Sequence, residues 1–240
     1  MSKIITVAGS SDSGKTTAAL KFAQEIHESK SGSVIFLSPD IQVPVMGFLF
    51  PHCKESDLYS VGKTLDKTDI FKEDVQKSLV TVKTMKNFGI LGYKAGETYY
   101  SYPRPTEDKI YALFRACKEL ADYLVVDVSS DEDDLISAMA VSEAETVVQM
   151  ITPDLKCMTY YSSHNTVYKN LQEKIIKVMN INDRDLYLPI AEVKEHFKNV
   201  QFTLPYSRAL KQQAITGTLS ERVPDQKYRS VMTALVKAVV

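Results

Sequence analysis

The chain carries one glycine-rich segment suited to binding phosphate, Gly9-Ser10-Ser11-Asp12-Ser13-Gly14-Lys15-Thr16-Thr17. It fits G-x-x-x-x-G-K-[ST], in which the glycines let the backbone bend so that successive N–H groups point at phosphate oxygens. Lys15 would reach the terminal phosphates, and the Thr16 hydroxyl would hold Mg²⁺. An apolar run, residues 4–8, precedes the segment, and a helix-forming run follows it. This context favours strand, phosphate loop and helix over a glycine-rich turn with a surface lysine.

Two aspartates directly follow apolar runs further along the chain. Asp127 follows Leu124–Val126, and Asp40 follows residues 36–39. If those runs are parallel strands, both carboxylates emerge at the edge that carries the phosphate loop. A carboxylate there can hold the Mg²⁺ shell or orient a water toward the terminal phosphate. For Asp127 we favour the metal-side role, whereas a turn-forming role after Pro39 fits Asp40 about as well.

These side chains need a scaffold of strands and helices. Apolar, β-rich runs recur with helix-forming stretches between them: residues 4–8, 34–37, 88–91, 123–126, 146–150, 175–179 and 200–204. This alternation predicts an α/β fold, a mostly parallel, doubly wound sheet with helices on both faces. With the phosphate loop after the first strand, the arrangement resembles that of P-loop NTPases. The length and apolar content favour a single domain spanning residues 1–240.

Three polar segments lie between the predicted strands. We expect short helices from Ser56 to Lys86 and an exposed loop from Gly96 to Pro105, which holds three tyrosines around two prolines. The run of acids at 131–134 is typical of a solvated helix start, because acids favour the positive end of a helix.

Composition narrows the cellular setting. Lys and Arg number 29 against 30 Asp and Glu, so the overall charge does not indicate nucleic acid or an anionic membrane as a partner. The three cysteines are scattered without C-x-x-C spacing, which argues against both a disulfide framework and a zinc site. No apolar run approaches the ~20 residues needed to cross a bilayer. We expect a soluble, cytoplasmic protein.

Later segments extend the pattern in an order shared with a known family. They are Ser38-Pro39-Asp40-Ile41-Gln42, Ile151-Thr152-Pro153-Asp154, Asn180, and Leu204-Pro205-Tyr206-Ser207 followed by Ala214 and Gly217. Together with the phosphate loop and Asp127, they resemble the MinD/ParA family of P-loop ATPases over nearly the whole chain. The late segments are most similar to the branch that contains flagellar-placement and pilus-assembly positioning proteins.

The resemblance implies ATP and Mg²⁺ as cofactors and gives individual residues roles. Asp127 would support the Mg²⁺, and Asp40, catalytic together with Lys15, would face the attacking water. Asn180, whose amide offers both a donor and an acceptor, would contact adenine, and Pro205 would shape the base pocket. Taken alone, Asn180 would be an ordinary turn residue.

Three positions depart from the family pattern. Ser10 stands where typical members carry a second lysine that crosses a dimer interface to the partner's phosphates. Ser38 replaces the first acid of a D-x-D pair, and Asp127 is followed by Val128-Ser129-Ser130 without the usual Gly or Pro. Cationic groups on the transferring phosphoryl are worth about 10³ or more in rate. We therefore expect slow or absent hydrolysis with nucleotide binding retained.

The partners implied by the resemblance are the proteins of a positioned assembly and a second copy of the chain, as a homodimer. Some relatives hold membrane through a terminal amphipathic helix, and residues 228–239 have helical apolar spacing; we favour core packing for this stripe over peripheral membrane contact. Lysines between 63 and 86 are interleaved with acids, which is typical of a solvated face, so nucleic-acid binding stays open but is not indicated by charge.

The leading hypothesis is an ATP-binding, weakly hydrolysing positioning protein of MinD/ParA type that recruits partners at a polar or envelope structure such as a pilus. One alternative is an active ATPase for plasmid or chromosome partition, which needs another basic residue in place of the absent lysine. A second is a small-molecule kinase or ATP-dependent ligase of the same fold, for which the sequence shows no polar cluster marking an acceptor pocket.

Overall fold

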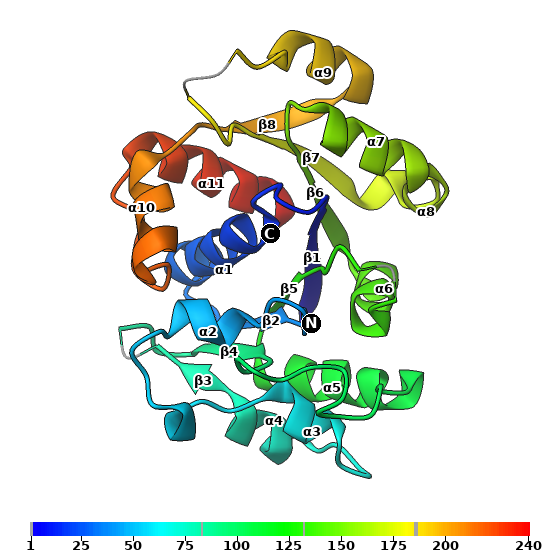
Figure 1. Ribbon diagram of the computed structural model, residues 1–240, viewed down its shortest axis with the longest axis vertical. Coiled ribbons are helices and arrows are strands. Elements are labelled where there is room, and N and C mark those ends of the chain that lie inside the picture. The colour runs from blue at the N-terminus through cyan, green and yellow to red at the C-terminus, as the bar shows by residue number, and fades with distance from the viewer. Residues whose placement is uncertain (1, 83, 132, 185–186) are drawn as a thin grey trace.

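The computed structural model describes residues 2–82, 84–131, 133–184 and 187–240. Within them, eight strands form one sheet in the order β3-β4-β2-β5-β1-β6-β7-β8 (Figure 1). The strands are β1 (Lys3–Gly9), β2 (Val34–Ser38), β3 (Val80–Thr81), β4 (Phe88–Gly92), β5 (Tyr123–Asp127), β6 (Thr146–Ile151), β7 (Ile175–Asn180) and β8 (Val200–Leu204). Only the pairing of β3 with β4 is antiparallel among these strands. The predicted mostly parallel α/β sheet is confirmed.

Helices cover both faces of the sheet. They are α1 (Lys15–Lys30), α2 (Val45–Leu49), α3 (Val61–Leu65), α4 (Lys72–Ser78), α5 (Glu107–Leu120), α6 (Leu135–Glu143), α7 (Leu155–Ser163), α8 (Asn165–Lys169), α9 (Ile190–Phe197), α10 (Arg208–Thr216) and α11 (Gln226–Val239), with 3₁₀ turns at Glu55–Asp57 and Gln172–Lys174. Figure 1 shows α1, α10 and α11 on one face and α5, α6 and α7 on the other.

Alternation along the central strands builds two cores. In β1, Ile4 and Ala8 belong to the core beneath α5, α6 and α7, whereas Ile5 and Val7 belong to the core beneath α1 and α11. Each of these four side chains is buried. Because successive side chains of a strand point to opposite faces, a strand buried on both sides must be apolar throughout. That requirement explains why the strands were recognisable as continuous apolar runs.

The sequence predictions between the strands are confirmed with two refinements. Residues 56–86 contain the expected short helices, but they also include the short edge strand β3, which two residues could not reveal as a pattern. Residues 96–105 lie in a loop, and Tyr100 is fully exposed as expected. Tyr99 and Tyr102 of the same loop instead donate hydrogen bonds to Asp131 and Glu97.

The last helix is part of the core. Tyr228, Met232, Leu235, Val236 and Val239 of α11 are all buried, in the cluster that α1 and β8 also line. The apolar stripe therefore packs inside the protein, as the core interpretation predicted. No helix of the described residues is both long and apolar enough to span a bilayer.

Helix α1 is also fastened to the segment that precedes α11. Lys21, only 4% exposed, donates from Nζ to the carbonyls of Leu219 at 2.5 Å and Glu221 at 2.6 Å. Gln24, one turn further, donates to the carbonyl of Ser220 at 2.8 Å. These side chains donate to three consecutive carbonyls of an irregular, partly buried segment. Without such donors, burying these carbonyls would cost free energy.

Replacing Lys21 with alanine should therefore lower the free energy of unfolding by about 2 kcal/mol, since two carbonyls lose their donor. Urea denaturation followed by circular dichroism measures this. Lys30→Ala, at the exposed end of the same helix, is the matched control and should be near neutral. An equal change in the free energy of unfolding for the two substitutions would contradict the proposed stabilising role of the Lys21 hydrogen bonds.

Candidate nucleotide-binding site

A cleft of about 520 Å³ opens at the carboxyl edge of the sheet. Three segments line it, and they follow β1, β2 and β5, which are neighbours in the sheet. The lining residues are Ser11, Asp12, Gly14, Lys15, Thr16, Thr17, Asp40, Gln42, Val43, Ser129, Ser130 and Asp131. Parallel pairing thus brings together the phosphate loop and the segments after both predicted strand-end aspartates, as the sequence suggested.

The phosphate loop depends on its two glycines. Gly14 has φ of 77°, and a Cβ there would lie 2.7 Å from Nδ2 of Asn180. At Gly9, a Cβ would lie 2.6 Å from Oγ of Ser13. Helix α1 begins at Lys15, immediately after Gly14, so its unpaired amides and the positive end of its dipole face the cleft. A backbone of this shape is an anion-binding cradle.

Lys15 bridges two of the segments that line the cleft. Its Nζ donates to Oγ of Ser130 at 2.7 Å, and that hydroxyl lies 3.3 Å from the carbonyl oxygen of Gly9, to which it donates. The ammonium group is therefore held over the phosphate loop by the segment that follows β5. A phosphate entering the cleft would compete with Ser130 for this group.

Asp127, the last residue of β5, is 2% exposed. Its Oδ2 accepts a hydrogen bond from Oγ of Ser38 at 3.0 Å, while no donor among the described residues reaches the buried Oδ1. Burial raises the pKa of Asp127 to about 6, opposed by the charge of Lys15 and by the hydroxyls of Thr16 and Ser38. A buried carboxylate oxygen without a donor, beside a threonine hydroxyl, suits a hard cation.

Solved structures similar to this one share its architecture over nearly their full length. A ParA family ATPase from Chlorobium tepidum TLS superposes with a TM-score of 0.78 and 12% identity, covering 98% of this chain and 99% of that one. The septum site-determining protein MinD from Pyrococcus horikoshii OT3, complexed with Mg-ADP, gives 0.75 and 16%, with coverage of 100% and 96%. A single-residue variant of Cyanothece McdA in complex with ATP gives 0.72 and 17%, with coverage of 99% and 96%.

This chain has the fold of the MinD and ParA ATPases. The resemblance found in the sequence is confirmed at that level. No protein-family model and no curated protein matches the sequence itself.

The departures from the MinD/ParA pattern have visible structural consequences. Ser10, where the family carries its second lysine, is 2% exposed, so the side chain at this position is buried. Ser38, in place of the first acid of the pair, uses its hydroxyl to support Asp127. A second carboxylate at residue 38 would lie against Asp127 in a buried site, so the serine keeps the aspartate as the only acid of that contact.

Lys156 is a residue that the sequence reasoning missed. It lies in the first turn of α7, and its Nζ is 2.6 Å from Oδ2 of Asp12 in the phosphate loop. The side chain remains 57% exposed. The only sequence signal for this contact is that Lys156 lies two residues after Asp154, the N-cap of α7. Helix α7 follows β6, which pairs with β1, the strand before the phosphate loop.

Asp40 shows the turn-forming geometry that the sequence allowed. Its Oδ1 accepts hydrogen bonds from the amides of Gln42 at 2.9 Å and Val43 at 3.0 Å. The residue also lines the cleft, where a water-orienting role would place it. That catalytic role stays a prediction.

Asp131 connects this segment with two others. It accepts from the hydroxyl of Tyr99 at 2.6 Å and from Nε2 of Gln42 at 2.7 Å, and these donors lower its pKa. The acidic run does precede a helix as expected, since Asp134 caps α6. Asp131 is not simply solvated, however, because it joins the segments after β2 and β5 to the loop of residues 96–105, which we call the tyrosine loop. Glu132 of the run lies outside the described residues.

Asn180 is the last residue of β7, and Pro205 directly follows the last residue of the neighbouring β8. Asn180 donates from Nδ2 to the carbonyl of Ser13 at 2.9 Å, which the sequence did not predict. Leu204 pairs with Asn180 in the sheet, so Pro205 emerges next to it. Asn180 thus contacts the phosphate loop, and the roles of both residues toward a base stay predictions.

Asp134 makes the stability of this region depend on pH. Its carboxylate accepts from the amide of Ile136 and the hydroxyl of Ser137, and burial raises its pKa from the ordinary 3.8 to about 6. The folded state therefore binds the proton more tightly than the unfolded state, so this group's contribution is present below pH 4 and is lost as the pH rises through 6.

Asp134→Asn keeps the cap but cannot ionise, so it should be more stable than the wild type by about 1 kcal/mol or more at pH 7.5. The advantage should vanish near pH 3.5, where both residues are neutral. Urea titrations at the two pH values measure it. An advantage of equal size at both would show that charge burial is not its cause.

Proposed function

We propose that the protein binds ATP with Mg²⁺ in the cleft and acts as a positioning or partition protein of MinD/ParA type, recruiting protein partners in a nucleotide-dependent way. The observation that carries the proposal is the convergence of the phosphate loop, Lys15, Thr16 and the buried Asp127 at one edge of this fold. Solved relatives of the fold are described with Mg-ADP, AMPPNP and ATP bound, which supports the same class of ligand here.

The residues present fit a magnesium–nucleotide complex better than a metal ion alone. Among the described residues, no three His, Cys, Asp or Glu side chains are placed to hold a metal by themselves. Asp127 and the Thr16 hydroxyl offer hard oxygen ligands, which leaves positions for phosphate oxygens and water. Mg²⁺ bound there would neutralise phosphate charge and fix the phosphate orientation.

The chain's own residues would then couple binding to conformation. Lys15 exchanges its hydrogen bond to Ser130 for one to a phosphate oxygen, which releases the segment after β5. Asp131 of that segment holds Gln42 and Tyr99, so the change reaches the segment after β2 and the tyrosine loop. Ordering of such segments by the terminal phosphate is a known way to create a partner surface.

The finer form of the proposal is a slow or non-hydrolysing scaffold that works as a dimer at a polar or envelope structure such as a pilus. It rests on the similarity of the late segments to that branch and on the absence of a cation at Ser10. Without that charge, the developing charge on the transferred phosphoryl loses a major source of stabilisation.

A second candidate function, an active partition ATPase, gains one specific observation. It requires a basic residue to replace the lysine missing at position 10, and Lys156 lies against Asp12 of the phosphate loop. The ammonium group of Lys156 would need only to leave the carboxylate of Asp12 and bind a phosphate oxygen instead. Lys156 therefore decides between the two candidates.

Lys15→Ala should weaken binding of a fluorescent ATP analogue in the presence of Mg²⁺ by about tenfold to a hundredfold, because a charged hydrogen bond to phosphate is lost. Lys30→Ala, at the far end of α1, is the control and should bind as the wild type does. Unchanged affinity in Lys15→Ala would contradict the proposed site.

Steady-state ATP hydrolysis by Lys156→Ala tests the second candidate. An active ATPase that uses Lys156 should lose more than about tenfold in turnover, while Asp12→Asn, which breaks the ion pair but keeps the cation, should retain it. Asn tolerates the left-handed backbone of residue 12, where φ is 64°. Turnover that is slow in the wild type and unchanged in Lys156→Ala would leave the slow scaffold as the remaining form of the proposal.

A further inference from the structure

A second cavity, of about 280 Å³, lies beside the nucleotide cleft, and we call it the tyrosine cavity. Tyr93, Tyr99 and Tyr102 line it together with three prolines and with Asp133 and Asp134. Its volume is close to the lower limit for small-molecule sites, about 300 Å³, so it suits a small ligand or a single side chain. Neither the phosphate loop nor Asp127 belongs to it.

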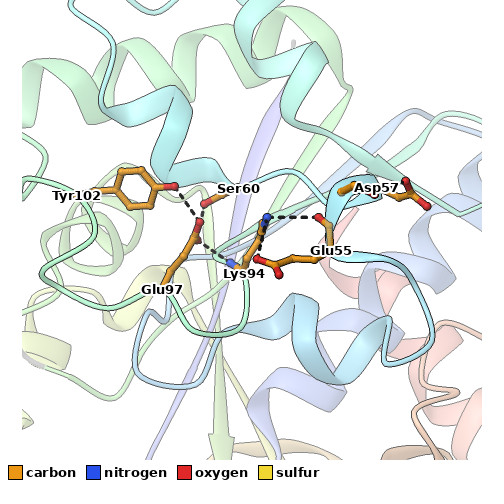
Figure 2. A network of polar contacts seen from close by, with 7 residues as sticks. Glu55, Asp57, Ser60, Lys94, Glu97 and Tyr102 are labelled. Carbon is orange, nitrogen blue, oxygen red and sulfur yellow. Dashed lines mark hydrogen bonds and ion pairs between the residues drawn. The ribbon is translucent and has the colours of Figure 1, made fainter.

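The aromatic wall is fixed before any ligand arrives. The hydroxyl of Tyr102 donates to Oε1 of Glu97 at 2.8 Å, and Oε2 of Glu97 accepts from Oγ of Ser60 at 2.6 Å and from the amide of Lys94 at 2.7 Å (Figure 2). Tyr93 packs against Tyr102 with ring centroids 6.4 Å apart. A wall held in this way loses little conformational entropy on binding.

The charges around the cavity favour a cation. Asp133 is exposed, and the donors that Asp134 meets among the described residues are uncharged, the amide of Ile136 and the hydroxyl of Ser137. The faces of the tyrosine rings are also electronegative. The protein's own Arg104 already lies over Tyr99, 5.5 Å from the ring centroid, so a guanidinium group is compatible with this wall.

We propose that the tyrosine cavity binds an organic cation, a guanidinium or primary ammonium group on a short apolar stem. The stem packs on the tyrosines and prolines, and the cationic head faces the aspartates. A free metabolite and a basic side chain of a partner protein share this chemistry.

Binding in the tyrosine cavity should also affect the nucleotide cleft, and this second part rests on the proposed function. Pro39 and Ile41 line the tyrosine cavity, whereas Asp40 and Gln42, alternating with them, line the cleft. Tyr99 additionally shares the Asp131 carboxylate with Gln42. A ligand that moves Tyr99 therefore changes a contact of the cleft, and by linkage nucleotide must change the ligand's affinity equally.

The test is a titration with agmatine in the absence of nucleotide, followed by saturation-transfer NMR of its methylene protons. Saturable binding in the millimolar range or tighter is expected. A second arm uses the blocked peptide acetyl-Gly-Arg-Gly-amide; binding of the peptide in preference to agmatine assigns the site to a protein side chain, and the reverse assigns it to a metabolite. No saturable binding in either arm overturns the proposal.

Substitutions test whether agmatine binding depends on the charges around the cavity. Asp133→Asn should weaken agmatine binding by about threefold or more, and Arg104→Gln, which removes the competing guanidinium, should tighten it. Asp108→Asn, at the exposed start of α5, is the control and should have no effect. Shifts of Asp133→Asn and Arg104→Gln in the same direction would contradict the proposal.

Lys15→Ala separates this inference from the proposed function. The variant should bind agmatine as the wild type does, because Lys15 does not line the tyrosine cavity. Agmatine binding without any effect of ATP on its affinity would leave the cavity intact and overturn only the coupling.

Discussion

The parallel pairing of β2, β5 and β1 is the constraint on which the site depends. It places the carboxyl ends of three strands side by side, so that residues about 120 positions apart in the chain meet at one edge. Pairing aligns Val7 with Asp127 and Leu37 with Val126, which sets Asp127 between the phosphate loop and Ser38. The apolar side chains that bury both faces of these strands therefore also fix the geometry of the cleft.

Lys15 and the buried Asp127 are the two charged groups that lie closest to the expected phosphate and metal positions, while Asp12, Asp40 and Asp131 also line the cleft. Lys15 and Asp127 flank the phosphate loop, and each is held by a serine of a neighbouring segment, Ser130 and Ser38 respectively. Neutral serines at these positions hold the charged groups without adding a further charge beside them. The hydrogen bonds of Asp131 then connect the cleft to Gln42 and Tyr99, so the nucleotide cleft and the tyrosine cavity share one wall.

Much of the architecture could be predicted from the sequence because strands buried on both faces must be continuously apolar. The phosphate loop could also be predicted, because its structure requires glycine at two positions of the motif. Ser13 approaches Gly9 closely and Asn180 approaches Gly14, which leaves no room for a Cβ at either glycine. Contacts between distant side chains could not be predicted. Lys156 reaches Asp12 across 144 positions, and Tyr99 reaches Asp131 across 32. Such pairs depend on how α7 and the tyrosine loop pack against the rest of the protein. The spacing of apolar residues in the sequence carries no information about that packing. Edge strand β3 was missed because two residues are too few to form a pattern.

The central claim is that ATP with Mg²⁺ binds at this edge of the sheet and reorganises the segments after β2 and β5. Amide hydrogen exchange of the whole chain, with and without ATP and Mg²⁺, measures it most directly. The account predicts that ATP slows exchange in residues 9–17 and changes it in 39–43 and 129–131. Unchanged exchange in the phosphate loop at saturating ATP, or protection confined to other segments, would contradict the account.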